Sequence, residues 1–472
     1  MKRGVIWGVG ILAVVLIAAY FVAGVLIRKK VDEALRSLPP ELTIRYTALH
    51  SSIFNGSLDL SGLTIHYSKD KHVYEASIDH VSMAGIRFFE LMRTHRLRVR
   101  TLRVDGLKAS EEKTKLSLEG SVELDSVYAE EKGEKGFGEL RLAITRGRYQ
   151  LPDAGETIHL SNMVLDSKKK LFRLDTLRLT PVPDKMKMGE KKGHQVDVVE
   201  ATSEGIEADG VDVMGLPEHR LVADRITIRR NKIYVFRDRR LPLEPGVKAM
   251  PMELLKALPV SLRIKLVNLG TTNFTYEEFP KKGEKTGTMK IYRLAGTLEP
   301  LINKPVAGDP AYLTMRIEGS LMNSGLVSAI TKMPLRKGDP YRVEGAFHEL
   351  DVTKLNDPAE NLGMLHLESG MLNSLAFRFE MNEEKATGQI VGEYHDLVVD
   401  KLRENGKKDK LKSFALKKFI IPRDKDKSLP EKKRTGKVDY KRDPQRNFSY
   451  YLLHSLLVGV KSSFSLGFLL PG

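Results

Sequence analysis

The sequence predicts a mainly β protein in which an N-terminal transmembrane helix precedes a twisted antiparallel β-sheet with few short helices. Two observations lead to this expectation. One uncharged apolar run lies near the start of the chain, and after it apolar and polar residues alternate with a period of two. A strand that buries only one of its faces requires that alternation.

The N-terminal run, Gly4–Ile27, has 24 residues without a charge. At about 1.5 Å per residue it is long enough to cross a hydrocarbon core of roughly 30 Å. A cleaved signal peptide would have a shorter apolar run followed by small residues, whereas this run ends in Arg28-Lys29-Lys30. We therefore expect an uncleaved anchor. Basic residues flank both ends, so charge bias leaves the orientation open.

The rest of the chain is expected to be a β-rich body. The whole chain has 472 residues, 41% of them hydrophobic, and so can bury a large core. Alternating pairs and triplets recur along the body, among them Leu42/Ile44/Tyr46, Leu262/Ile264/Leu266 and Leu313/Met315/Ile317. The expected organisation is an anchor at 1–30, a β-rich body at 31–404, a basic flexible loop at 405–437, and a C-terminal strand with an apolar helix at 438–472.

Turns, helices and loops are assigned from glycine, asparagine, proline and charge. Gly147, Asn231 and Gly270 each interrupt an alternating strand and predict hairpin turns, because such turns need positive φ. Met252–Leu258 and Gly325–Thr331 are the helical candidates in the body. Charged, glycine-containing stretches predict loops, and these stretches are Glu130–Gly138, Pro183–Gly193, Pro280–Gly287 and Gly406–Gly436.

Asn447–Phe464 is strongly apolar, and Lys461 is its one charged residue. The stretch is short for a second membrane span and contains Ser449, His454 and Ser455. It predicts an amphipathic helix that either packs on the sheet or lies at a membrane interface.

The net charge of +16 is concentrated in one stretch. Between Lys401 and Lys437 there are fifteen Lys or Arg and five Asp or Glu residues, which accounts for ten of the sixteen excess charges. The only aromatics there are Phe414 and Phe419, so the stretch lacks the interleaved aromatics of a nucleic-acid surface, and no nucleic-acid partner is expected. It is either a solvated loop or a contact to anionic head groups.

No catalytic, cofactor-binding or metal-binding residue is predicted, and no enzyme activity is expected. The chain has no cysteine, which excludes disulfides and thiol chemistry. Gly283–Gly287 lacks the glycine spacing of a phosphate-binding loop. His66, His72 and His80 lie close in sequence without a metal-ligand spacing and are expected to be exposed on strands.

In their order along the chain, several strand-and-turn patterns resemble the AsmA-like family of diderm bacteria, whose members have one inner-membrane helix followed by a periplasmic β-groove. The segments that carry the resemblance are Ile44–Ile65, Leu254–Glu277, Glu368–Phe379, Ala386–Gly388, Tyr394–Leu397 and Thr435–Asp443 with the apolar stretch to Val460. The resemblance implies an elongated sheet that forms a groove, a cytoplasmic N-terminus and a periplasmic body. No functional residue is transferred from the family.

The leading hypothesis is a membrane-anchored periplasmic protein of the bacterial inner membrane that takes part in phospholipid transport or lipid homeostasis between the inner and outer membranes. Its partners would be phospholipid, bound through acyl chains in the groove, and the inner membrane, held through residues 4–27. The alternative is a non-catalytic scaffold or assembly factor that binds outer-membrane or other envelope proteins.

Overall fold

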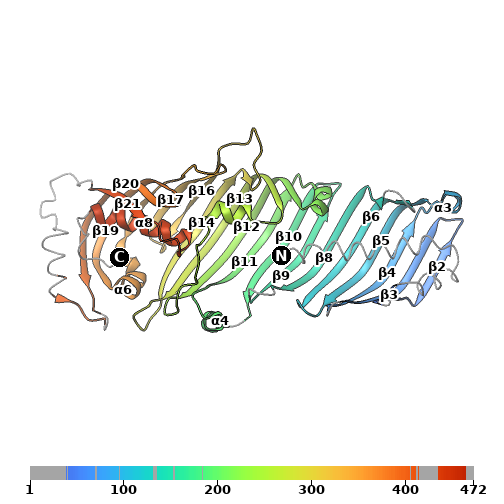
Figure 1. Ribbon diagram of the computed structural model, residues 1–472, viewed down its shortest axis with the longest axis horizontal. Coiled ribbons are helices and arrows are strands. Elements are labelled where there is room, and N and C mark those ends of the chain that lie inside the picture. The colour runs from blue at the N-terminus through green and yellow to red at the C-terminus, as the bar shows by residue number, and fades with distance from the viewer. Residues whose placement is uncertain are drawn as a thin grey trace. The chain divides into compact units, whose positions relative to one another are not determined.

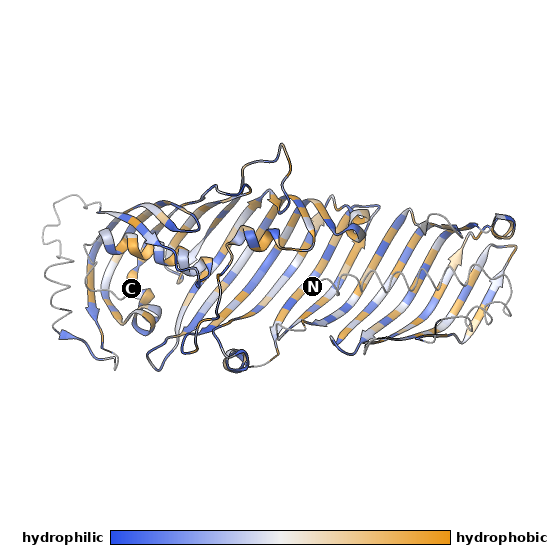
Figure 2. Ribbon diagram, viewed as in Figure 1, coloured by the Kyte–Doolittle hydropathy of each residue, from blue (hydrophilic) through white to orange (hydrophobic). Residues whose placement is uncertain are grey.

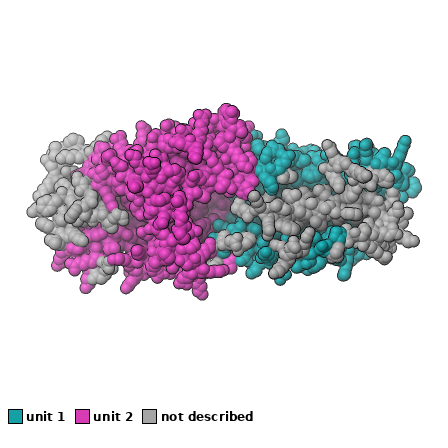
Figure 3. All heavy atoms as spheres, viewed as in Figure 1, with its two compact units in different colours: residues 1–180, 204–224 teal, residues 181–203, 225–472 magenta. Residues whose placement is uncertain are grey.

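A computed structural model describes residues 39, 41–69, 72–94, 96–130, 135–151, 155–182, 184–403, 406–410, 413 and 434–463. The protein is mainly β, with 62% strand, and its helices are few, so the expected fold class is confirmed at this level. The chain forms two compact units, which Figure 3 colours separately. Unit 1 comprises residues 1–180 and 204–224, and unit 2 comprises residues 181–203 and 225–472.

The predicted membrane anchor lies outside the described residues. So do residues 31–38 of the expected body and most of the expected basic loop. In the part of the chain that the structure describes, no helix is long and apolar enough to cross a membrane. Strand β21 (Arg434–Lys441) begins inside the range that was expected to be loop.

Unit 1 is built on an antiparallel sheet (Figure 1). Its elements are β1 (Leu42–Arg45), β2 (Ala48–Ser52), β3 (Ser57–Lys69), β4 (His72–Ala84), α3 (Phe88–Thr94), β5 (Arg96–Glu111), β6 (Leu116–Glu130), β7 (Lys135–Gly136), β8 (Glu139–Gln150), β9 (Glu156–Asp166), β10 (Leu171–Pro181) and the 3₁₀ helix η1 (Val213–Glu218). Both β1 and β2 pair with β3, and pairing continues from β3 through β4, β5, β6 and β8 to β9. Each of these pairs is antiparallel.

Period-two alternation decides which face of this sheet is buried. Along β5, Leu102 and Val104 are buried, and Arg103 between them is exposed. Successive side chains of a strand point to opposite faces, so these two apolar residues share one face. Figure 2 shows the resulting apolar and polar bands along the strands.

Unit 2 contains a second run of antiparallel pairs together with most of the helices. Its elements are α4 (Lys185–Lys192), α5 (Pro251–Lys256), β13 (Ser261–Phe279), β14 (Gly287–Glu299), β15 (Leu301–Ile302), β16 (Tyr312–Leu321), β17 (Gly325–Pro334), β18 (Tyr341–Asp351), the 3₁₀ helix η2 (Val352–Leu355), α6 (Asn356–Gly363), β19 (Leu365–Met381), β20 (Lys385–Lys401), β21 and α8 (Phe448–Ser463). Pairing runs from β13 through β14, β16, β17, β18, β19 and β20 to β21, and β15 pairs with β13. Strands β11 (Asp197–Asp209) and β12 (Arg220–Asp238) contribute residues to both units.

The three predicted hairpin turns are wrong. Gly147, Asn231 and Gly270 lie inside β8, β12 and β13, and none of them has a positive φ. A Cβ added to Gly270 would stand 2.2 Å from the carbonyl oxygen of Arg229 in β12. Glycine at this position therefore permits close approach of a neighbouring strand and does not form a turn.

Three of the helix and loop assignments also need correction. The expected loop at Glu130–Gly138 contains the two-residue strand β7. Gly325–Thr331 belongs to strand β17, whereas the helix expected at Met252–Leu258 is confirmed as α5. The expected loop at Pro183–Gly193 contains helix α4. The side chain of Asp184 caps α4 by accepting from the N–H of Met186, and Gly193 ends it in the left-handed conformation.

Candidate functional site

Apolar side chains form rows across one face of the unit 2 sheet. Ile317, Ala329, Gly345, Phe377 and Ile390 are register partners on successive strands from β16 to β20. Directly opposed residues share a face, so this row lies on a single side of the sheet. Two rows flank it on the same face. One row consists of Met315, Thr331, Val343 and Phe379, and the other consists of Val327, Phe347 and Leu375. The expectation that Leu313, Met315 and Ile317 share a face is confirmed.

Burial is graded across these rows. Val343, Phe377 and Phe379 are buried, whereas Val327 and Phe347 keep part of their surface in solvent. Phenylalanine rings connect the rows, because the centroid of Phe377 lies 5.8 Å from that of Phe347 and 6.1 Å from that of Phe379. This face is thus largely apolar, and it is covered at Val343, Phe377 and Phe379 but only partly covered at Val327 and Phe347.

Helix α8 covers one end of the apolar face, where it packs on β20 and β21. Tyr451, Ser455 and Gly459 are the buried residues of the helix, and Leu452, Leu456 and Val460 pack against the same core. The interpretation of this stretch as a packed helix is confirmed for residues 448–463. Leu453 and Leu457 point away from the core and are exposed.

Contacts distant in sequence fix the segment that leads into α8. Arg442 is buried, forms an ion pair with Glu383 and donates to the carbonyl of Lys248. The amide of Asn447 donates to the carboxylate of Asp197 at 3.3 Å. These contacts hold the start of α8 against parts of unit 2 that are far away in the sequence.

Helix α5 contributes to the same apolar core through Met252 and, less completely, Leu255. The backbone N–H of Met252 donates to the hydroxyl of Tyr341 at 3.0 Å. Burial raises the pKa of Tyr341 to about 12, so the hydroxyl stays neutral at physiological pH. The hydroxyl therefore serves as a hydrogen-bond partner and not as a base.

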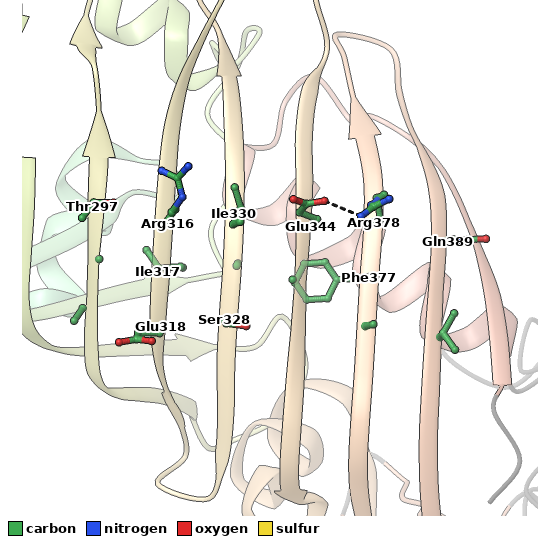
Figure 4. A pocket seen from close by; sticks show the side chains of 16 residues that line it. Thr297, Arg316, Ile317, Glu318, Ser328, Ile330, Glu344, Phe377, Arg378 and Gln389 are labelled. Carbon is green, nitrogen blue, oxygen red and sulfur yellow. Dashed lines mark ion pairs between the residues drawn. The ribbon is translucent and has the colours of Figure 1, made fainter. Parts of the chain in front are cut away.

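The opposite face of this sheet is polar and carries a shallow hollow of about 740 Å³ (Figure 4). Arg316, Ile330, Glu344, Arg378 and Gln389 form one cross-strand row along it. Arg378 pairs with Glu344 at 3.1 Å, and Arg316 pairs with Glu299 at 2.5 Å. Since these charges neutralise each other at the surface, the hollow does not resemble a site for an apolar chain or for an anion.

Lys185, Tyr234 and Glu277 form a polar cluster in unit 2. The ammonium of Lys185 donates to Glu277 Oε2 at 2.9 Å and to the Tyr234 hydroxyl at 2.9 Å, and Tyr234 donates to Glu277 Oε2 at 2.5 Å. Lys185 also lies 4.8 Å from the centroid of the Phe236 ring. The cluster joins the start of α4 to β12 and β13, and all of its polar groups are engaged with each other.

Of the histidines that were considered as metal ligands, His66 lies on β3 and His80 on the neighbouring strand β4, each beside a different carboxylate. His66 lies 3.6 Å from Glu75, and His80 lies 3.4 Å from Asp59. His72 is the first residue of β4. Within the described residues, no group of three or more His, Cys, Asp or Glu side chains is arranged to hold a metal ion.

A comparison of the chain with protein-family models and with curated proteins finds no match. The candidate site therefore depends on its geometry alone. Sequence alternation identified part of the apolar face in β16. It did not identify the Gly345–Phe377 pair or the contact of α8 with β21, because a single strand carries no signal of its neighbours' register.

Proposed function

We propose that this protein takes part in phospholipid transport or lipid homeostasis between two membranes and that it shields acyl chains against the apolar face of unit 2, which would form a groove. The observation that supports this proposal is the set of largely apolar rows from β16 to β20, which is only partly covered around Val327 and Phe347. Burial of a methylene group is worth about 0.8 kcal/mol, so such a surface can compensate an acyl chain for leaving a bilayer.

The cellular arrangement belongs to the same proposal. We infer that Gly4–Ile27 anchors the chain in a bacterial inner membrane and that the β-rich body lies in the periplasm. The uncharged length of that segment supports the anchor, and the resemblance to the AsmA-like family supports the orientation.

Two neighbouring positions on opposite faces of β18 test the proposal. Phe347 lies on the apolar face, and His348 is exposed on the polar face. A photo-cross-linking amino acid is introduced at either position in the full chain, and the cross-linked species are identified by mass spectrometry. We expect phospholipid adducts at position 347 and a several-fold lower yield at position 348.

A charge substitution provides the second measurement. Val327 pairs with Phe347, whereas the neighbouring Ser328 is exposed on the other face. We expect Val327→Glu to lower the amount of phospholipid that co-purifies with the full chain, and Ser328→Glu to leave it unchanged. Equal cross-linking at positions 347 and 348, or adducts to envelope protein alone, would reject the lipid proposal and favour a scaffold.

A further inference from the structure

Four large apolar side chains protrude together from unit 1. In the turn between β2 and β3, Phe54 is 102% exposed and Ile53 is 45% exposed. In α3, Phe89 is 79% exposed and Met92 is 49% exposed. We call these four residues the tip patch. Phe54 thus leaves as much surface in solvent as an isolated residue would.

The two halves of the tip patch are fixed beside each other. The N–H of Ile86 donates to the carbonyl of Gly56 at 2.8 Å, which joins the β2–β3 turn to the residues just before α3. A Cβ added to Gly56 would lie 2.8 Å from the carbonyl oxygen of Ile86, so the contact is tight. Figure 1 shows β2 and α3 at the same end of unit 1.

The sheet determines which side of α3 faces outward. Phe88 and Leu91, three residues apart, are buried, and this leaves Phe89 and Met92, also three residues apart, on the outer side. The N–H of Arg87 donates to the carbonyl of Arg98 at 3.2 Å, which attaches the start of the helix to β5. The exposed apolar side chains therefore belong to an ordered element.

The part of the tip patch in α3 belongs to a basic stretch of the chain. Between positions 87 and 100 the described chain has one acidic residue, Glu90, which lies 3.1 Å from Arg98 and 3.5 Å from Arg87. The five arginines of the same stretch leave a local excess of positive charge, and they are Arg87, Arg93, Arg96, Arg98 and Arg100. Of these, Arg96 pairs with Glu130 at 3.2 Å.

We propose that the tip patch docks unit 1 on the surface of a bilayer that contains anionic phospholipid. Exposed apolar patches mark interaction sites, and an apolar tip with basic residues around it is the composition of a membrane-interface element. The aromatic and aliphatic side chains would enter the boundary between head groups and acyl chains. The arginines would remain among the head groups, where anionic lipid attracts them.

Covalent geometry allows the tip patch to reach the membrane of the predicted anchor. Fourteen residues separate Ile27 from Leu42, the first residue of β1. Fully extended, they span at most about 50 Å. From Leu42 to Ile53 the strands β1 and β2 cover roughly 36 Å at 3.3 Å per residue, which is less than the reach of that linker. The inference goes beyond the proposed function, because it concerns a different unit and the bilayer surface itself.

The absence of cysteine makes a direct test possible, because one introduced cysteine carries a nitroxide label at a defined place. The full chain is labelled at Phe54→Cys or Phe89→Cys and reconstituted into vesicles of phosphatidylcholine with phosphatidylglycerol. The control is Lys113→Cys, in the exposed turn between β5 and β6 at the other end of β5. We expect labels at positions 54 and 89 to be more accessible to oxygen than to a water-soluble nickel chelate, and the label at position 113 to show the reverse.

Charge dependence separates docking from accidental proximity. Arg93→Glu, combined with the label at position 54, is expected to reduce immersion in the anionic vesicles and to change little in pure phosphatidylcholine. Labels at positions 54 and 89 that are as accessible to the nickel chelate as the control would overturn the proposal, as would shielding that requires added envelope protein. Cross-linking at position 347 measures lipid contact in unit 2, whereas the labels at positions 54 and 89 measure membrane contact in unit 1. This inference and the proposed function can therefore fail separately.

Discussion

Gly436 of β21 and Gly459 of α8 face each other so closely that a Cβ added to Gly436 would stand 2.0 Å from the carbonyl oxygen of Gly459. Another Cβ, added to Gly459, would lie 2.9 Å from a methyl group of Val438. The two glycines therefore allow the helix to rest directly on the strand. This contact holds the cover at one end of the apolar face.

Gly436→Ala is expected to push α8 away from β21, because the added methyl group meets backbone that cannot yield locally. Overpacking of this kind costs about 1–3 kcal/mol. The measurements are the urea midpoint of the full chain and the rate of proteolysis within α8. Gly363→Ala is the matched control, since a Cβ at Gly363 would meet nothing within 4 Å. Equal proteolysis rates in both variants would show that the contact does not hold α8.

Asn303 connects three backbone groups around α5 and β13. It is buried, its Oδ1 accepts from the N–H of Leu262 at 2.8 Å, and its Nδ2 donates to the carbonyls of Val260 at 2.7 Å and Leu255 at 3.2 Å. Asn303→Leu removes all three hydrogen bonds. Each backbone group that then stays buried without a partner lowers the free energy of unfolding by about 1–3 kcal/mol. We expect a marked fall in the thermal midpoint. Lys304→Ala, at the exposed neighbouring position, should change the midpoint little.

Substitution of Asn231 tests whether this residue lies in a hairpin turn or inside a buried strand. Its side chain accepts from the Ser203 hydroxyl at 2.8 Å and donates to Thr272 Oγ1 at 3.0 Å. A hairpin turn would tolerate Asn231→Gly, but a buried strand position should lose about 1–3 kcal/mol with these bonds. Lys232→Gly, at an exposed position of the same strand, corrects for the general cost of glycine. A larger loss at Lys232 than at Asn231, measured by urea unfolding, would contradict the buried-strand assignment.

Glu277 gives the stability of unit 2 a pH dependence. Burial alone raises the pKa of Glu277, but hydrogen bonds from Tyr234 and Lys185 lower it overall. A carboxyl group with a lowered pKa stabilises the fold above its unfolded value of about 4.3, and this contribution is lost as pH falls through the lower folded value. The difference in thermal midpoint between the wild type and Glu277→Gln should therefore be largest above about pH 5 and shrink below about pH 4.

Glu284→Gln controls for the removal of a carboxylate, because Glu284 is exposed in the turn before β14. Its thermal midpoint should follow that of the wild type across the whole pH range. A midpoint difference for Glu277→Gln that stays constant from pH 7 to the acid limit would disprove the assigned role of the cluster.

The sequence by itself determined that the protein is mainly β with few helices, and it determined the faces of many strands. Leu313, Met315 and Ile317 lie on one face, as their alternation predicts, because the side-chain direction in a strand is a local property with a period of two. The helix at α5 could also be predicted, since prolines bound it. Because the sequence has no catalytic spacing motif, the expected site was an apolar surface of the sheet and not a catalytic centre.

Only the tertiary structure decided which polar and glycine residues pack between strands or against a helix. Gly270 lies close to a carbonyl oxygen in β12, and Gly436 lies close to the backbone of α8. Asn231 forms hydrogen bonds with hydroxyl groups in β11 and β13. Arg442 pairs with the carbonyl of Lys248, 194 positions earlier. A turn signal depends on a residue's own φ, but these roles depend on atoms that are brought close only when distant strands pair. For that physical reason, local sequence patterns could not distinguish them.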